Sequence, residues 1–210
     1  MKIENAVPGD VDEVAHLHIH VFPGFFLTSL GPVFLKELYR GFLSHPSGIF
    51  LVARNEDGII GFVAGTSEPE VFFNELRRRR GLFFGLKALP AILGNPLPVV
   101  RKLFYALRYR GDAPVARVSG ALLSSIGVAG LVKGTGVAGR LVAAFEDEAR
   151  KRGARSVYLT TDVHANERVN TFYVKHNYRI RDQFKQGGRR DMFRYEKILV
   201  PDARTMGEQS

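Results

Sequence analysis

The chain has 210 residues, of which 45% are hydrophobic, and this is enough to bury one substantial core. It contains no cysteine, which excludes a disulfide framework, a thiolate metal site and a cysteine nucleophile. The formal net charge is +9, from 30 basic and 21 acidic residues. The N-terminus lacks the apolar run and cleavage site of a secretory signal, so we expect a cytoplasmic protein.

The first part of the chain predicts a strand over residues 1–7, followed by two helices and two further strands. Asp10, followed by Glu13 three positions later, resembles a capping box and predicts a helix through about His20. Proline is tolerated in a first helical turn, so Pro32 predicts a second helix over residues 32–43. The apolar stretch over residues 48–68 predicts two strands joined by a hairpin turn at residues 55–58.

The basic excess lies in one segment that follows these strands. Residues 77–110 hold nine Lys or Arg and no Asp or Glu, so the rest of the chain carries 21 basic and 21 acidic residues. We expect a single domain over residues 1–200 with a helical basic insertion at about 69–113. Residues 201–210 are expected to form a C-terminal tail.

The remaining elements alternate between strands and helices. They are predicted to be a strand over residues 116–128, interrupted at Gly120, a helix over 137–152, a strand over 156–163, a helix over 166–177 and two strands around a turn at 186–189. This order predicts an α/β fold with a mixed sheet flanked by helices.

Three glycines, Gly134, Gly136 and Gly139, form a G-x-G-x-x-G pattern between a predicted strand and a predicted helix. Such a turn lets backbone amides converge on a phosphate, and Lys133 and Arg140 add positive charge. A dinucleotide-binding fold would place the first glycine directly after its strand and an acidic residue, here Asp162, on the next strand. Five residues intervene, and only 48 residues follow Asp162, too few for a second nucleotide-binding half.

Two motifs at a fixed separation resemble the GNAT family of N-acetyltransferases. The stretch KGTGVA, residues 133–138, resembles the family's acetyl-CoA signature Q/R-x-x-G-x-G/A, and it follows the strand end IGV, residues 126–128. Downstream, NERVNTFYVKHNY, residues 166–178, resembles N-x-x-A/V-x-x-x-Y-x-x-x-G-F. Asn177 stands where glycine is usual, and asparagine also tolerates a left-handed helix end.

The resemblance implies a splayed, mostly antiparallel sheet and acetyl-CoA as the co-substrate. The residues that it implies for acetyl-CoA binding are Ile126, Gly127, Val128, Lys133, Gly134, Thr135, Gly136, Val137, Ala138, Gly139, Arg140, Asn166 and Tyr173. Asn166 would contact the pantetheine or nearby water. Core packing would explain Val169, on the same helix face, but it would not call for Asn166.

The chemistry of acetyl transfer needs an oxyanion donor, a proton for the thiolate and a base for the amine. By resemblance, the amide of Val128 is the donor and Tyr173 is the acid, since a phenol pKa of about 10 is close to that of a thiol. Asp162 is the candidate base, with His164 or water alone as alternatives. Asp162 could equally cap the helix that follows it.

The acceptor site is expected to be walled by Phe22, Phe25 and Phe26 of the first helices and their loop. A looser likeness to members encoded with surface-polysaccharide genes suggests an amino sugar as the acceptor. A protein N-terminus or lysine is an alternative acceptor, and an inactive protein that senses acetyl-CoA or associates with membranes is an alternative function. His16, His18 and His20 are interpreted as surface or packing residues, and no metal is expected.

The basic insertion has two competing interpretations. Its apolar run, bracketed by arginines and interrupted by prolines, suits either a segment lying on an anionic membrane face or a helical insertion over the acceptor site. Residues 77–110 would be the membrane contact. Nucleic acid is disfavoured because no binding motif is recognisable. The protein is expected to be a monomer or a homodimer.

Overall fold

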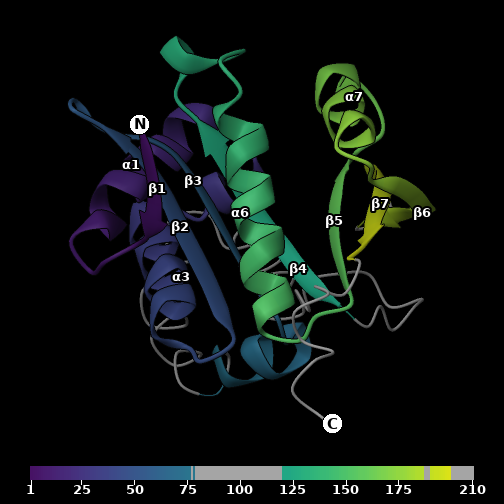
Figure 1. The fold of residues 1–210 in the computed structure, drawn as a ribbon, viewed down its shortest axis with the longest axis horizontal. Helices are drawn as coiled ribbons and strands as arrows, with labels where there is room; N and C mark the ends of the chain where they lie inside the picture. Colours follow the sequence, from purple (N-terminus) through teal and green to yellow (C-terminus); the bar gives the residue numbers. More distant parts are fainter. Residues whose placement is uncertain (77, 79–119, 187–189, 200–210) are drawn as a thin grey trace, which may run out of the picture.

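The computed structural model describes residues 1–76, 78, 120–186 and 190–199. Of Phe26, it describes the backbone but not the side chain. Its strands form one sheet in the order β1-β2-β3-β4-β5-β7-β6 (Figure 1). All neighbours are antiparallel except β4 and β5, which are parallel. The strands are β1 (Lys2–Asn5), β2 (Gly48–Asn55), β3 (Gly58–Thr66), β4 (Ala121–Val128), β5 (Ser156–Asp162), β6 (Arg179–Gln186) and β7 (Arg190–Ile198).

Helices cover both faces of this sheet (Figure 1). They are α1 (Asp10–Val21), α2 (Phe26–Ser29), α3 (Pro32–Ser44), a helix over residues 69–76, the 3-10 turn η1 (Gly130–Val132), α6 (Val137–Lys151) and α7 (Glu167–Lys175). Helices α1 and α3 bury one apolar cluster against β2–β4, and α6 buries a second on the opposite face. The predicted mixed α/β fold is confirmed.

The start of α1 differs from the predicted capping box. Gly9, not Asp10, is the N-cap residue. Asp10 accepts a hydrogen bond from the amide of Val7 at 2.9 Å, and Glu13 accepts one from the amide of Ile59 at 2.8 Å. Both carboxylates therefore join the helix to neighbouring segments, which spacing along the helix cannot reveal.

Strand β4 also departs from the expected pattern. It begins after Gly120, where an added Cβ would lie 2.4 Å from the hydroxyl of Ser156. The irregularity falls instead at Ser124, because the register with β3 shifts there. Beyond this bulge, Ile126 and Val128 pack with the α6 core, whereas an added Cβ on Gly127 would meet Phe62 of the α1 core.

Strands β4 and β5 pair over two residues only. The partners are Ala121 with Val157 and Leu122 with Tyr158, after which the two strands are not hydrogen-bonded to each other. We call the segments that follow, residues 123–128 and 159–162, the β4–β5 splay (Figure 1). The predicted splayed sheet is confirmed, and both segments run toward the same edge.

Much of the predicted insertion and the tail lies outside the described residues. Of the insertion, the structure describes the helix over residues 69–76 and residue 78. Among the described residues, no helix combines the length and apolar character needed to cross a bilayer.

Candidate functional site

The glycine turn lies between the end of β4 and the start of α6. Gly134 has φ +89° and Gly136, the N-cap of α6, has φ +82°, a left-handed conformation that favours glycine. An added Cβ at either position would meet no atom within 4 Å. These two glycines therefore serve the backbone conformation of an exposed turn, which presents the free amides of the α6 N-terminus.

The third glycine has a different cause. An added Cβ on Gly139 would lie 2.5 Å from Nε2 of His176, at the end of α7. Gly139 thus permits close packing of α6 on α7, a role that the sequence pattern had assigned to the ligand. Around the turn, Lys133, Thr135 and Arg140 are exposed, Val137 is buried and Ala138 is half-buried.

The amide of Val128 is directed into the β4–β5 splay. The amide of the next residue, Ala129, donates to the carbonyl of Ile60 on β3 at 2.9 Å. Successive amides of a strand point to opposite edges, so the amide of Val128 points to the edge where β5 has departed. A donor in this position is the feature that the oxyanion role requires.

Helix α7 is fastened to the end of β5 by side-chain amides. Nδ2 of Asn166 donates to Oγ1 of Thr161 at 2.6 Å and to the carbonyl of Asp162 at 3.2 Å. Asn170 donates to the same carbonyl at 3.2 Å. The amino group of Asn166 is therefore used within the protein, and its carbonyl oxygen is the group left to contact a ligand.

Tyr173 lies in the aromatic core below this attachment. Its side chain is 5% exposed, and its ring packs against Tyr178 at 5.6 Å and Tyr195 at 5.8 Å between centroids. Burial raises the pKa of the Tyr173 phenol. The phenol therefore stays protonated, but its pKa lies further from that of a thiol.

The end of α7 follows the expectation for Asn177 but not for Val169. Asn177 has φ +66°, and the amide of Tyr178 reaches back to the carbonyl of Tyr173 at 3.0 Å, as in a Schellman motif. Val169 is exposed, so the interpretation of Val169 as a core residue was wrong.

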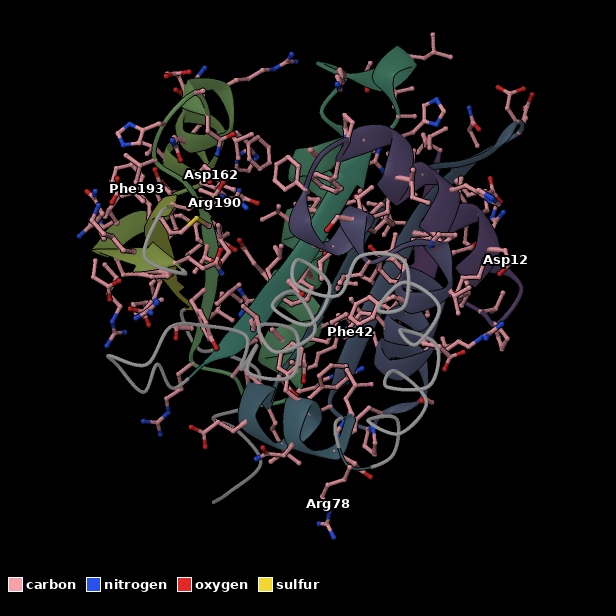
Figure 2. All side chains as sticks on the ribbon, turned by 180° about the vertical axis from the view of Figure 1, so that it is seen from behind. Asp12, Phe42, Arg78, Asp162, Arg190 and Phe193 are labelled. Carbon is pink, nitrogen blue, oxygen red and sulfur yellow. The ribbon has the colours of Figure 1, made fainter. Side chains whose placement is uncertain are left out.

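Asp162 is held by an arginine that the sequence analysis did not single out. Nε of Arg190 donates to Oδ1 of Asp162 at 2.8 Å and Nη2 donates to Oδ2 at 2.5 Å, and Figure 2 shows the two side chains together. The N-cap of α7 is Asn166, and no side chain caps the helix, so the capping alternative for Asp162 was wrong. His164 is exposed and contacts Asp191 at 3.3 Å.

The predicted acceptor residues lie on the α1 side of the β4–β5 splay. An added Cβ on Gly127 would lie 3.4 Å from Cε2 of Phe22. The ring of Phe22 is 5.3 Å from that of Phe25, over which the guanidinium of Arg190 lies at 5.8 Å. The side chain of Phe26 is outside the described part of the structure.

His18 differs from the two histidines beside it. His16 and His20 are exposed, whereas His18 is buried and its Nδ1 lies 2.6 Å from the hydroxyl of Tyr39. Its Nε2 has no hydrogen-bond partner within the described ranges. Burial lowers the pKa of His18 to about 4, so the ring is neutral at neutral pH. The described residues contain no group of three potential metal ligands.

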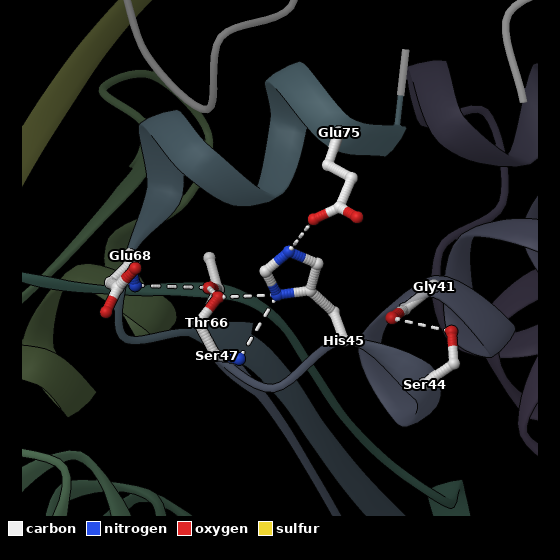
Figure 3. Close-up of polar contacts among 7 residues, drawn as sticks. All are labelled: Gly41, Ser44, His45, Ser47, Thr66, Glu68 and Glu75. Atoms are coloured by element: carbon white, nitrogen blue, oxygen red, sulfur yellow. Dashed lines mark hydrogen bonds and ion pairs between the residues drawn. The ribbon is translucent and has the colours of Figure 1, made fainter. Parts of the chain in front are cut away.

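A second polar cluster occupies the Thr66 end of β3 (Figure 3). It lies beside a cavity of about 480 Å³. His45 Nε2 lies 2.8 Å from the carboxylate of Glu75, and its Nδ1 accepts from the amide of Ser47 at 3.1 Å. The hydroxyl of Ser47 bridges His45 and Thr66, at 2.8 Å from each. Both nitrogens of His45 are thus engaged within the protein, and the sequence analysis did not anticipate this cluster.

The family comparison agrees with this geometry. Residues 102–178 match the model of the acetyltransferase (GNAT) family, and this range includes β4, the glycine turn, α6, β5 and α7. Over these residues the chain is similar to the GNAT acetyltransferases. The search of curated proteins found no match to the sequence.

Solved structures share the GNAT fold over nearly the whole chain. One is an aminoglycoside 6'-N-acetyltransferase complexed with coenzyme A, with TM-score 0.60, 16% identity and coverage of 96% of this chain and 99% of that chain. Another is a ribosomal-protein-alanine N-acetyltransferase from Brucella melitensis, with TM-score 0.61, 14% identity and coverage of 95% and 100%. A third is Ard1 from Thermoplasma volcanium, with TM-score 0.60, 14% identity and coverage of 95% and 97%. At these identities the likeness establishes the fold.

Proposed function

We propose that this GNAT protein transfers the acetyl group of acetyl-CoA to the primary amine of a small acceptor. One observation carries the proposal: the β4–β5 splay opens directly beside the left-handed glycine turn at the start of α6. A thioester in the splay would then have its pyrophosphate at the turn. The match of residues 102–178 to the GNAT family supports acetyl-CoA as the co-substrate.

The glycine turn supplies the groups that a pyrophosphate needs. The amides at the start of α6 are free, and the helix dipole favours negative charge there. Lys133 and Arg140 are exposed on either side of the turn and add two cations. At the start of α7, the carbonyl oxygen of Asn166 would accept a hydrogen bond from an amide group of pantetheine, because its amino group is used within the protein.

The reaction requires three functions from the chain. The amine nitrogen attacks the thioester carbonyl, the C–S bond breaks as the N–C bond is completed, and the nitrogen loses a proton. The amide of Val128 would stabilise the oxyanion, and Tyr173 would protonate the departing thiolate. Asp162 would take the amine proton through water.

The acceptor remains the open part of the proposal. We favour an amino sugar, in line with the looser likeness to surface-polysaccharide members. Phe22 and Phe25 offer apolar surface and Asp162 offers a carboxylate, a combination that suits a cationic amine on a ring. Peptide amines are the alternative, since one of the structural neighbours is named as a ribosomal-protein-alanine N-acetyltransferase.

The first test is acetyl-CoA binding by calorimetry with Gly136→Val. A β-branched residue strains the left-handed turn and narrows the phosphate position, so we expect the Kd to rise about tenfold or more. Gly153→Val is the matched control, because Gly153 has φ +79° at the far end of α6 and open space around it. Equal affinity changes in the two variants would contradict the site.

The second test is CoA release with amino sugars, free peptide N-termini and lysine peptides. CoA release with amino sugars would support an amino sugar as the acceptor. CoA release with peptides and not with amino sugars would show that the acceptor is a peptide amine. Binding of acetyl-CoA without release on any amine would identify an acetyl-CoA-sensing protein and contradict the proposed catalysis.

A further inference from the structure

A row of side chains lies across the β4–β5 splay on its α1 side. Phe22 lies beside Gly127 of β4, where an added Cβ would be 3.4 Å from its ring, and contacts lead from Phe22 through Phe25 and Arg190 to Asp162 on β5. Strands β4 and β5 do not hydrogen-bond to each other here, so these contacts connect the two sides instead. Arg190 is the member that joins the aromatic side to the acidic side.

The Arg190–Asp162 contact has a geometry that fixes orientation. Two parallel N–H···O bonds to both carboxylate oxygens leave the plane of the carboxylate no freedom to rotate. The contact also joins neighbouring strands, since Asp162 pairs with Met192 in the β5–β7 register. Asp191, which follows Arg190, is already bound to Lys185 and His164, so it does not compete for the guanidinium.

The face of Arg190 adds a second constraint. Its guanidinium lies 5.8 Å from the centroid of Phe25, within the range of a cation–π contact. The side chain of Arg190 is 43% exposed, so the group also meets solvent at the acceptor side of the splay. A lysine could keep the charge but not the paired bonds and the planar stacking.

We propose that Arg190 is the positioning residue of the acceptor side, which orients the Asp162 carboxylate toward the bound amine and ties it to the loop between α1 and α2 through Phe25. This inference rests on the proposed acetyl transfer. Arg190 acts through Asp162, so its removal affects the acceptor and leaves acetyl-CoA binding at the glycine turn unchanged.

The first experiment tests the contact without any activity. In the ¹⁵N-labelled full chain, the Nε–H signal of Arg190, assigned with Arg190→Lys, is expected to exchange slowly with water and to become fast-exchanging in Asp162→Asn. A fast-exchanging signal in the wild-type protein would overturn the proposal. This readout does not depend on acetyl transfer, so it separates failure of the inference from failure of the proposed function.

The second experiment is a double-mutant cycle on kcat/KM for an amine acceptor. Arg190→Gln is expected to lower this value about tenfold or more, because misplacement of a reacting group is costly, and to leave the acetyl-CoA Kd within about twofold. In the Asp162→Asn background the same change should have little further effect. Arg190→Lys should lie between wild type and Arg190→Gln.

The control is Arg181→Gln, which removes another arginine–carboxylate pair, with Glu196, from the same sheet. It should leave kcat/KM unchanged. Equal losses from Arg190→Gln with and without Asp162, or a parallel loss of acetyl-CoA affinity, would overturn the positioning role.

Discussion

The two ends of β3 differ in how completely their polar groups are hydrogen-bonded. At the Thr66 end, His45 uses both ring nitrogens and Ser47 bridges two neighbours, so the cluster is closed on itself (Figure 3). At the other end, where Gly61 pairs with Val128, the amide of Val128 points away from β3 and faces the β4–β5 splay.

This difference separates a structural site from a candidate binding site. A buried polar group that is fully paired contributes stability, and a ligand gains little by approaching it. A donor that is free in the absence of ligand can bind one without first breaking a bond. The His45 cluster looks more like a catalytic triad in its composition, yet the less conspicuous β4–β5 splay has the available groups.

The largest expected effect tests the β4–β5 splay. Tyr173→Phe should lower kcat about 100-fold or more, because protonation of the thiolate is lost. The acetyl-CoA Kd, measured by calorimetry, should stay within about twofold. Tyr195→Phe is the matched control, since it removes a phenol from the same aromatic cluster that is bonded to Asn170 instead. Full kcat in Tyr173→Phe would reduce this residue to packing.

A substitution in the His45 cluster should change the stability of the protein and leave acetyl-CoA binding unchanged. His45→Phe keeps a ring beside Phe72 but removes the acceptor for the Ser47 amide and the bond to Glu75. The free energy of unfolding, from urea titration, should fall by about 2 kcal/mol. The acetyl-CoA Kd should not change. A change in affinity larger than the change in stability would show that the two ends are not independent.

The smallest expected effect is the change in stability for each unit of pH. His18 stays neutral to about pH 4 in the folded protein, whereas its imidazole takes up a proton near pH 6.5 when unfolded. The unfolded chain therefore binds more protons between pH 6.5 and 4. The free energy of unfolding should fall as the pH is lowered through this window, by at most about 1.4 kcal/mol per pH unit from this residue.

His18→Phe measures that contribution directly. Urea unfolding at pH 6.5, 5.5 and 4.5 should show a weaker loss of stability in the variant than in the wild type. Identical slopes for the two proteins would contradict the burial of a neutral His18.

Local patterns in the sequence predicted most of the fold. The apolar face of α6, the left-handed glycines and the asparagine that ends α7 are each set by residues within a few positions of one another. The burial of His18 was also accessible, because His16 and His20 share a helix face that excludes it. The capping box predicted for α1 was wrong because the Glu13 carboxylate accepts a hydrogen bond from Ile59 of β3, which is far along the chain.

The missed part of the candidate site depends on strand order. Arg190 reaches Asp162 only because β7 lies next to β5 in the sheet, and no spacing within either segment signals that neighbour. Gly139 also depends on the assembled fold, because its close approach to His176 at the end of α7 cannot be seen in the glycine pattern. The role of a residue that contacts another helix or strand can be predicted only when the arrangement of these elements is known.

The strand order also has a consequence for synthesis of the protein. Strand β3 pairs with β2 as soon as the hairpin forms, but its other edge is completed by β4, and residues 67–120 must be translated in between. At a translation rate of about 5–20 residues per second, that edge of β3 stays unpaired for several seconds during synthesis. An unpaired apolar strand edge is a template for association with other chains. The nascent chain is therefore most exposed to aggregation before the first motif of its candidate site has been made.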